Sequence, residues 1–135
     1  MEPSPTDYKT KPLAFVDVET TGLSPSRNDI AEIGVVTVDV GRVERWSTLI
    51  KARSRREVAL AKGVAPDDLD NAPAFTDIAG SLAQRLSGRL LVAHNARFDY
   101  TFLRTAFQRV DISFEPELIC SVMLSRKLYF SETHH

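Results

Sequence analysis

The sequence predicts a single α/β domain with a mixed β-sheet, and three observations support this fold class. The 135 residues fit one domain of the usual roughly 100 to 200 residues. The hydrophobic share of 43% and the charged share of 26% are typical of a globular chain. Strand patterns come first as a hairpin set, and strand and helix patterns alternate afterwards, which is typical of a mixed sheet layered with helices. We place the domain at residues 12–135, behind a polar, aperiodic stretch at 1–11 that predicts a flexible arm.

The first strands are indicated by short apolar and β-branched runs. Residues 13–18 form an apolar run typical of a strand that is covered on both faces. β-branched residues dominate 30–40 and 43–50, and residues 40–42 supply a tight turn between them. This arrangement predicts a β-hairpin.

The next element is an amphipathic helix at about residues 75–86. Its apolar residues recur at helical spacing, Pro73 lies near its start and Gly88 lies just beyond its end. The stretch at 51–72 before it is irregular and predicts turns or short helices.

The last third predicts a strand followed by helices. Residues 90–93 form a short buried strand, and the apolar residues from 98 to 106 line one face of a following helix. Residues 117–129 predict a last helix.

Charge and cysteine content exclude several classes of protein. The net charge of −1 gives no general sign of a nucleic-acid or membrane partner, so such a partner must be recognised locally. The single cysteine, Cys120, cannot form an internal disulfide. No apolar run is long enough to span a membrane, and the polar start lacks the apolar region of a secretory signal. We therefore expect a cytoplasmic protein.

Two acidic residues stand at the end of the first predicted strand. Asp17 and Glu19 are two positions apart, so both carboxylates point to one face of the strand, together with Leu13 and Phe15. Two acids beside apolar positions require a compensating positive charge or a metal ion. An Asp-x-Glu tripeptide also arises by chance in a chain this acidic, so its context must decide.

A third acid, Asp99, lies in the first turn of the helix that follows the 90–93 strand. In a purely structural interpretation, Asp99 favours the positive end of the helix and Asn95 caps it. Carboxylates delivered from two strand ends to one edge of a sheet instead predict a site for Mg²⁺ or Mn²⁺, because these hard ions prefer oxygen ligands.

Two long motifs resemble a known family. FVDVETTGL at 15–23 and LVAHNARFDYTFL at 91–103 are similar to the first and second motifs of the DnaQ-like DEDD exonucleases, which include the proofreading epsilon subunit of bacterial DNA polymerase III. The segment at 62–89 resembles the family's connecting segment, and ICSVMLSRKLY at 119–129 resembles the part before its third motif. The resemblance covers about residues 12–133.

The resemblance implies a ribonuclease H-like fold and a 3′-to-5′ exonuclease that uses two divalent ions. Asp17 would bridge both ions, Glu19 would contact the ion nearer the attacking water, and Asp99 would hold the other. A set of nearby residues is implied to contact the terminal nucleotide: Thr20, Gly22, Leu23 and Phe98. For Leu23 and Phe98, packing in the core is an equally good interpretation.

Two further residues are interpreted as support for the site. As a functional residue His94 orients Glu19 or touches the nucleotide, and as a structural residue it satisfies backbone groups at the strand end; we favour support of the metal ligands. Asn95 is placed beside it in the same role.

The family's third motif, a His five residues before a final Asp, has no counterpart in the chain. The last Asp is Asp111, and His134 and His135 have no Asp after them. We therefore expect the chain to be inactive or severely impaired as it stands, with the closing helix missing, and the parent protein to continue and be active.

Several functions remain open at this level. Residues 42–62 carry seven basic against two acidic side chains, so a single strand of nucleic acid can lie along them, and a solvated basic loop explains the pattern equally well. The expected partner is a single-stranded DNA 3′ end. An RNA-trimming enzyme of the ribonuclease T or oligoribonuclease type shares the chemistry. A noncatalytic module that binds nucleic acid or a polymerase subunit is the alternative from another class, and an α/β domain with purely structural acids is the third.

Overall fold

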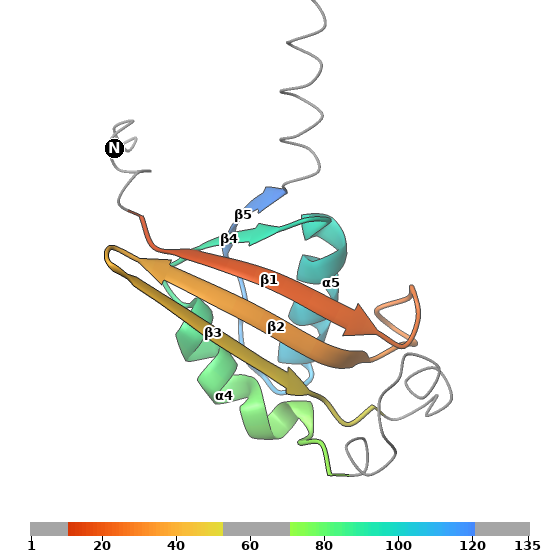
Figure 1. The fold of residues 1–135 in the computed structure, drawn as a ribbon. Coiled ribbons are helices and arrows are strands. Elements are labelled where there is room, and N and C mark those ends of the chain that lie inside the picture. The colour runs from red at the N-terminus through yellow and green to blue at the C-terminus, as the bar shows by residue number, and fades with distance from the viewer. Residues whose placement is uncertain (1–10, 53–70, 121–135) are drawn as a thin grey trace, which may run out of the picture.

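The protein is described from a computed structural model, which places residues 11–52 and 71–120. These residues form one five-stranded sheet with the strand order β3-β2-β1-β4-β5 and two helices (Figure 1). The elements are β1 (Leu13–Thr20), β2 (Ile30–Asp39), β3 (Arg42–Leu49), α4 (Phe75–Leu86), β4 (Leu90–Ala93), α5 (Ala96–Gln108) and β5 (Glu117–Cys120). The predicted mixed sheet flanked by helices is therefore confirmed.

The sheet is mixed because its two halves are connected differently. β1, β2 and β3 pair antiparallel, as expected for strands joined by short turns. β4 pairs parallel with β1, and β5 pairs parallel with β4, since a helix or a longer connection returns the chain to the same end of the sheet. The β2–β3 turn contains Gly41 at φ +76°, a backbone conformation that favours glycine.

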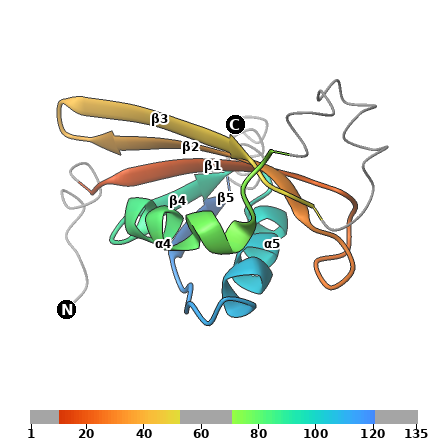
Figure 2. The ribbon, with the colours of Figure 1, turned by 90° about the horizontal axis from the view of Figure 1, so that it is seen from below.

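Both described helices pack on one face of the sheet (Figure 2). Alternate residues of β1, namely Ala14, Val16 and Val18, are buried beneath them. The core is completed by fully buried side chains of the helices, among them Leu82, Leu103 and Phe107. The other face of β1 is covered by neither α4 nor α5.

The helix at 75–86 has the predicted bounds. Asp77 Oδ2 accepts a hydrogen bond from the Ala74 backbone N–H at 3.0 Å, which satisfies one of the free donors at the helix start. Beyond the C-terminal end, Gly88 has φ +73°, so the chain can turn sharply into β4.

One predicted element is wrong in part. Residues 117–120 were expected to begin the last helix, but they form β5, which pairs with β4 from Glu117 opposite Leu90 to Cys120 opposite Ala93. A short apolar run does not distinguish helix from strand by itself, and here the free edge of β4 provides backbone partners. Residues 121–129 of that predicted helix lie outside the described residues, as do the arm at 1–10 and most of the irregular stretch at 51–72.

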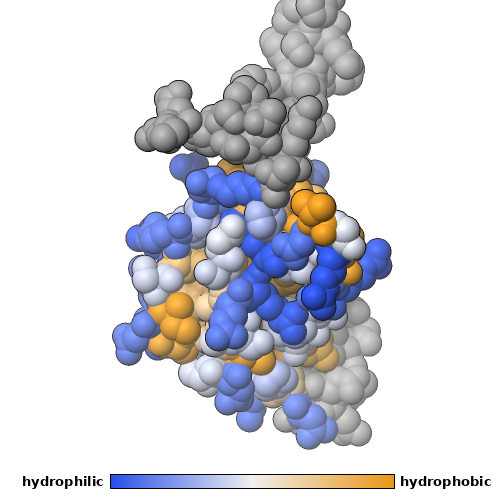
Figure 3. Space-filling view, turned by 90° about the vertical axis from the view of Figure 1, so that its left-hand side faces the viewer, coloured by the Kyte–Doolittle hydropathy of each residue, from blue (hydrophilic) through white to orange (hydrophobic). Residues whose placement is uncertain are grey.

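On the side of the β2–β3 hairpin, the described residues expose separate apolar side chains and not one large continuous apolar region (Figure 3). Figure 3 shows this side as mainly hydrophilic, with separate hydrophobic patches. Val40 and Val43 of the hairpin are 85% and 61% exposed. Among the described residues, no helix has the length and apolar character needed to cross a membrane.

Candidate active site

The first two acids lie on the face of β1 opposite the helices. Asp17 and Glu19 are both exposed and share this face with Phe15, as the alternation of the strand predicts. Asp17 lies opposite Gly34 of β2, which has no side chain to fill the space beside the carboxylate. The sheet thus presents Asp17 with open space next to it.

The third acid, Asp99, is held on α5. The helix starts directly after β4, whose C-terminal end lies beside β1, and Asp99 occupies its first turn. The Asp99 residue is only 5% exposed, and its backbone N–H donates to the Asn95 carbonyl at 3.2 Å. A carboxylate at this end of a helix is favoured by the helix dipole.

Electrostatics couple the three acids. Burial, as the largest cause, and the negative charges of Asp17 and Glu19 together raise the pKa of Asp99 to about 7. Such coupling requires the three carboxylates to lie near one another, although 82 positions of sequence separate Asp17 from Asp99. The structure therefore brings the two motifs together at one end of the sheet.

The three carboxylates have the chemistry that a hard divalent cation prefers, but their side chains do not surround a single ion position. Three carboxylates supply oxygen ligands and an excess of negative charge that a cation would neutralise. Within residues 11–52 and 71–120, however, no group of three or more His, Cys, Asp or Glu side chains is close enough to hold one ion. Rotation of exposed side chains such as Asp17 and Glu19 would be needed to complete the ligation.

A fourth acid, Glu32, was not singled out from the sequence. Its Cα lies opposite that of Glu19 in the β1–β2 register, just before the bulge between Glu19 and Thr20. Glu32 adds a further negative charge beside Glu19. Like charges directly opposite each other on neighbouring strands are destabilising. Only the register of the hairpin reveals this neighbour.

The residues after the acids form a compact loop between β1 and β2. Thr20 Oγ1 donates to the Gly22 carbonyl at 2.6 Å. Leu23 is 86% exposed, the largest exposure among the exposed large hydrophobic residues of the described chain. The core-packing interpretation of Leu23 is therefore wrong, and its side chain is available for contact with another molecule.

Phe98 is packed, in contrast to the exposed Leu23. It is partly buried against the core, and its ring centroid lies 4.8 Å from that of Phe102. This contact supports the packing interpretation that the sequence left open for Phe98.

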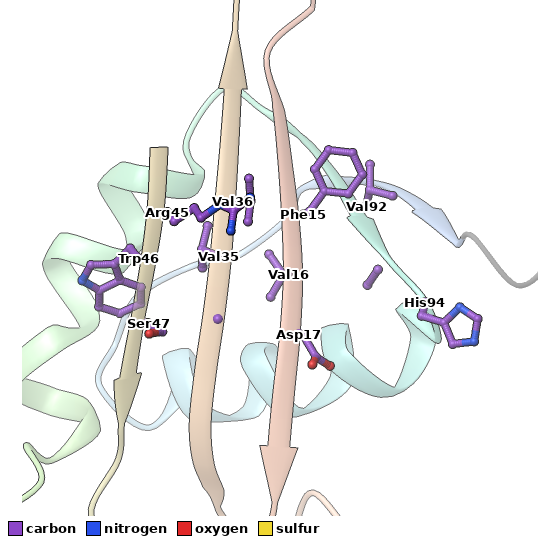
Figure 4. Close-up of a pocket in the computed structure, with 12 residues that line it drawn as sticks. Phe15, Val16, Asp17, Val35, Val36, Arg45, Trp46, Ser47, Val92 and His94 are labelled. Carbon is purple, nitrogen blue, oxygen red and sulfur yellow. The ribbon is translucent and has the colours of Figure 1, made fainter. Parts of the chain in front are cut away.

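The two predicted supporting residues lie at the junction of β4 and α5. His94 and Asn95 are both exposed. Asn95 occupies the N-cap position of α5, but its side chain makes no capping hydrogen bond. In Figure 4 the His94 ring points away from Asp17, and the His94 backbone carbonyl accepts a hydrogen bond from Cys120 Sγ at 3.5 Å.

A shallow pocket of about 620 Å³ extends from Asp17 across the sheet (Figure 4). Apolar side chains of four strands line it, including Phe15, Val36, Trp46 and Val92, and Arg45 also contributes. Phe15 is 44% exposed. Of the basic residues at 42–62, Arg42, Arg45 and Lys51 are described and exposed, and the other four lie outside the described residues.

Comparison with known proteins gives consistent results. The model of the RNase_T exonuclease family matches residues 14–134. The chain is 32% identical to DNA polymerase III PolC-type of Thermotoga petrophila over 126 residues, which cover 90% of the chain and 9% of that protein. It is 41% identical to DNA polymerase III subunit epsilon of Treponema pallidum over 90 residues, covering 64% of the chain and 42% of that protein.

A similar fold is found in solved structures. E. coli exonuclease I, in a zinc-bound complex with single-stranded DNA, superposes with a TM-score of 0.74 at 17% identity, over 89% of the chain and 30% of that protein. The chain thus spans less than half the length of each of these proteins. The match to the family model over nearly its whole length places the chain in the RNase_T exonuclease family, within the DnaQ-like group of 3′-to-5′ exonucleases.

Proposed function

We propose that this domain hydrolyses the terminal phosphodiester bond at the 3′ end of DNA and releases nucleoside monophosphates. The observation that carries the proposal is the electrostatic coupling of Asp99 to Asp17 and Glu19, which unites the two family motifs in one site. Membership of the exonuclease family supplies the reaction class.

Asp17, Glu19 and Asp99 would hold Mg²⁺ or Mn²⁺ in this proposal. Two such ions, when bound, make water a stronger nucleophile and stabilise the charge that develops on the phosphate. The protein contributes the arrangement of its carboxylates. β1 presents Asp17 and Glu19 on one face, and the first turn of α5 carries Asp99, whose pKa their charges raise. Asp17 would be the central ligand in this proposal, since Gly34, opposite it in β2, has no side chain to fill the space beside it.

The terminal nucleotide would be placed by the loop after β1. Leu23 offers an exposed apolar side chain that can pack against a base of any sequence. Thr20 and Gly22 would contact the same nucleotide through their backbone. The exposed ring of Phe15 lies on the same face of β1 as Asp17. Phe98 acts indirectly, because it packs in the helical layer.

We further propose that His94 and Asn95 support the metal ligands. The proposed substrate is a single-stranded DNA 3′ end. The proposed location is the cytoplasm. Relatives named as DNA polymerase III proteins favour DNA over RNA and also favour a polymerase subunit as partner. A noncatalytic nucleic-acid-binding module is the alternative, and the experiment below distinguishes it from an exonuclease.

The test compares the 135-residue chain with a version extended by its natural downstream residues, using end-labelled single-stranded DNA and Mg²⁺. We expect shortening from the 3′ end by the extended form and little or none by the chain as it stands. Asp17→Asn in the extended form should reduce the rate at least about a hundred-fold. Asp111→Asn is the matched control, because Asp111 is an exposed acid outside the site whose φ of 60° Asn also tolerates.

Two outcomes would contradict the proposal. A full rate for Asp17→Asn would remove this carboxylate from the mechanism. Binding of DNA without degradation by either form would favour the noncatalytic module, and faster degradation of RNA than of DNA would favour an exoribonuclease.

A further inference from the structure

The loop at residues 21–29, which we call the Leu23 loop, is closed by its own hydrogen bonds. The Thr21 backbone N–H donates to the Asp29 carbonyl at 2.9 Å, and the Asp29 N–H donates to Thr21 Oγ1 at 3.0 Å. Inside the loop, the Asn28 N–H donates to the Ser24 carbonyl at 2.7 Å, and the Ser24 N–H donates to Asn28 Oδ1 at 3.0 Å. These bonds define the loop's internal shape.

Close packing inside the loop also restricts its shape. A Cβ atom at Gly22 would lie 2.5 Å from the Asn28 side chain, closer than real atoms approach. Asn28 therefore fills the interior of the loop directly against the Gly22 backbone. Leu23, the next residue, is left pointing outwards with 86% of its surface exposed.

The loop is tied to the rest of the protein by one arginine of another element. Arg109, the residue directly after α5, contacts Asp29 Oδ1 through Nη1 at 3.5 Å. Its Nη2 donates to the carbonyls of Pro25 and Ser26 at 3.3 and 3.5 Å. The Asp29 side chain is only 12% exposed, so this ion pair is partly shielded from water.

We propose that Arg109 is a positioning residue that fixes the Leu23 loop on α5 and thereby strengthens binding of the DNA 3′ end. The inference rests on the proposed function, in which Leu23 contacts the terminal nucleotide. α5 carries Asp99 in its first turn and is followed by Arg109 at its other end. A single rigid helix thus sets the place of a metal ligand and of the loop that presents the apolar contact.

The physical basis is the conformational entropy of the loop, which would be lost on substrate binding if the loop were not anchored. An exposed apolar side chain on a mobile loop must be ordered when the substrate binds, and an anchor present beforehand removes that loss. The planar guanidinium can reach a carboxylate and two carbonyls at once, whereas a lysine ammonium is a single charge at the end of a flexible chain.

The first experiment measures hydrogen exchange in the 135-residue chain and requires no enzymatic activity. In Arg109→Ala, the backbone amides of Thr21, Arg27, Asn28 and Asp29, which all donate hydrogen bonds in the loop, should exchange faster than in the wild type. The core strands β1 and β2 should keep their protection. Arg104→Ala is the matched control, because Arg104 lies on α5 but pairs with Glu115 at 3.8 Å instead of with the loop.

The second experiment measures the affinity for a 5′-fluorescein-labelled oligothymidylate of about 12 nucleotides by fluorescence anisotropy, with Ca²⁺ in place of Mg²⁺. We expect Arg109→Ala to weaken binding roughly three- to ten-fold, and Arg109→Lys to lie between Arg109→Ala and the wild type. In a Leu23→Ala background, Arg109→Ala should add little, because both changes remove the same contact. Arg104→Ala should bind as the wild type does.

The outcomes separate this inference from the proposed function. If the wild type binds DNA but Arg109→Ala binds equally well, or weakens binding by the same factor with and without Leu23, the positioning role is overturned. Unchanged exchange of the loop amides would overturn the anchoring itself. If the wild type has no affinity for the oligonucleotide, the proposed function fails, and the inference fails with it.

Discussion

At the scale of single residues, Asp99 is buried, lies in the first turn of a helix and has two negative charges close to it. Its pKa of about 7 means that the metal-free protein keeps the Asp99 proton at pH values at which an ordinary aspartate has lost it. A divalent cation would compete with that proton. If Asp99 binds metal as proposed, its raised pKa makes binding of the ion dependent on pH.

The first prediction concerns the stability of the metal-free protein. Between about pH 4 and pH 7 the folded state holds the Asp99 proton and the unfolded chain does not, so the free energy of unfolding should fall as pH rises, by at most about 1.4 kcal/mol per pH unit. Above about pH 7 this contribution should level off. Asp99→Asn should remove it and be the more stable protein at pH 8.

Urea unfolding in EDTA, measured at several pH values for both proteins, checks this prediction. Added Mn²⁺ should restore stability at pH 8 to the wild type and not to Asp99→Asn. Identical pH dependence of the wild type and Asp99→Asn would show that Asp99 does not carry the raised pKa.

At the scale of elements, an ion pair fixes the far end of the sheet relative to the helical layer. The Arg89 guanidinium, in the turn between α4 and β4, binds Asp39 at the end of β2 through two hydrogen bonds of 3.0 Å. The same side chain donates to the Arg85 carbonyl at 2.8 Å. Arg89 is 19% exposed, which makes this pair better shielded than most ion pairs at a surface.

The second prediction compares two ion pairs of similar chemistry. Asp39→Ala should lower the free energy of unfolding by about 1–2 kcal/mol, because it leaves a partly buried guanidinium without its carboxylate. Glu44→Ala is the control, since Glu44 pairs with Arg42 across an exposed part of β3, and it should change stability by less than about 0.5 kcal/mol. Chemical denaturation measures both, and equal losses would contradict the assignment. Neither change should affect metal binding.

At the scale of the whole molecule, the protein has no overall charge that would attract DNA. The net charge is −1, and the acids of the site add negative charge where the phosphates must approach. In the proposed function, DNA would therefore bind through local cations, of which Arg45 lies in the pocket that begins at Asp17.

The third prediction follows from this distribution of charge. The affinity for single-stranded DNA should fall as salt rises, with a logarithmic slope of about −0.7 for each phosphate that is contacted. Arg45→Gln should weaken binding and reduce the magnitude of the slope by about 0.7, whereas Arg104→Gln, on α5, should leave it unchanged. Anisotropy titrations at several salt concentrations test this, and an affinity independent of salt would exclude docking through these side chains.

Much of this architecture could be predicted because its signals are local. The alternation in β1 predicts that Asp17 and Glu19 share a face, and the helical spacing at 75–86 predicts the bounds of α4. The strand at 90–93 was also predicted from its apolar residues, and it has these bounds. Each of these patterns is complete within about a dozen residues, so no distant partner is needed to interpret it.

Other features depend on partners that the local pattern does not contain. Residues 117–120 are a strand because β4 offers them a free edge, although their composition also suits a helix. The placement of Glu32 opposite Glu19 depends on the register of the hairpin. Arg109 reaches the Leu23 loop only because the end of α5 packs beside it.

By itself the amino-acid sequence predicted Asp17, Glu19 and Asp99 as the candidate acids of the site and the elements that carry them, because side-chain periodicity and motif spacing follow from the geometry of one strand or one helix. Only the tertiary structure decided that Leu23 is exposed while Phe98 is packed, that burial raises the pKa of Asp99, and which residues lie across from the acids. Burial, electrostatic coupling and register arise when distant segments come together, and no local pattern encodes the distance between them.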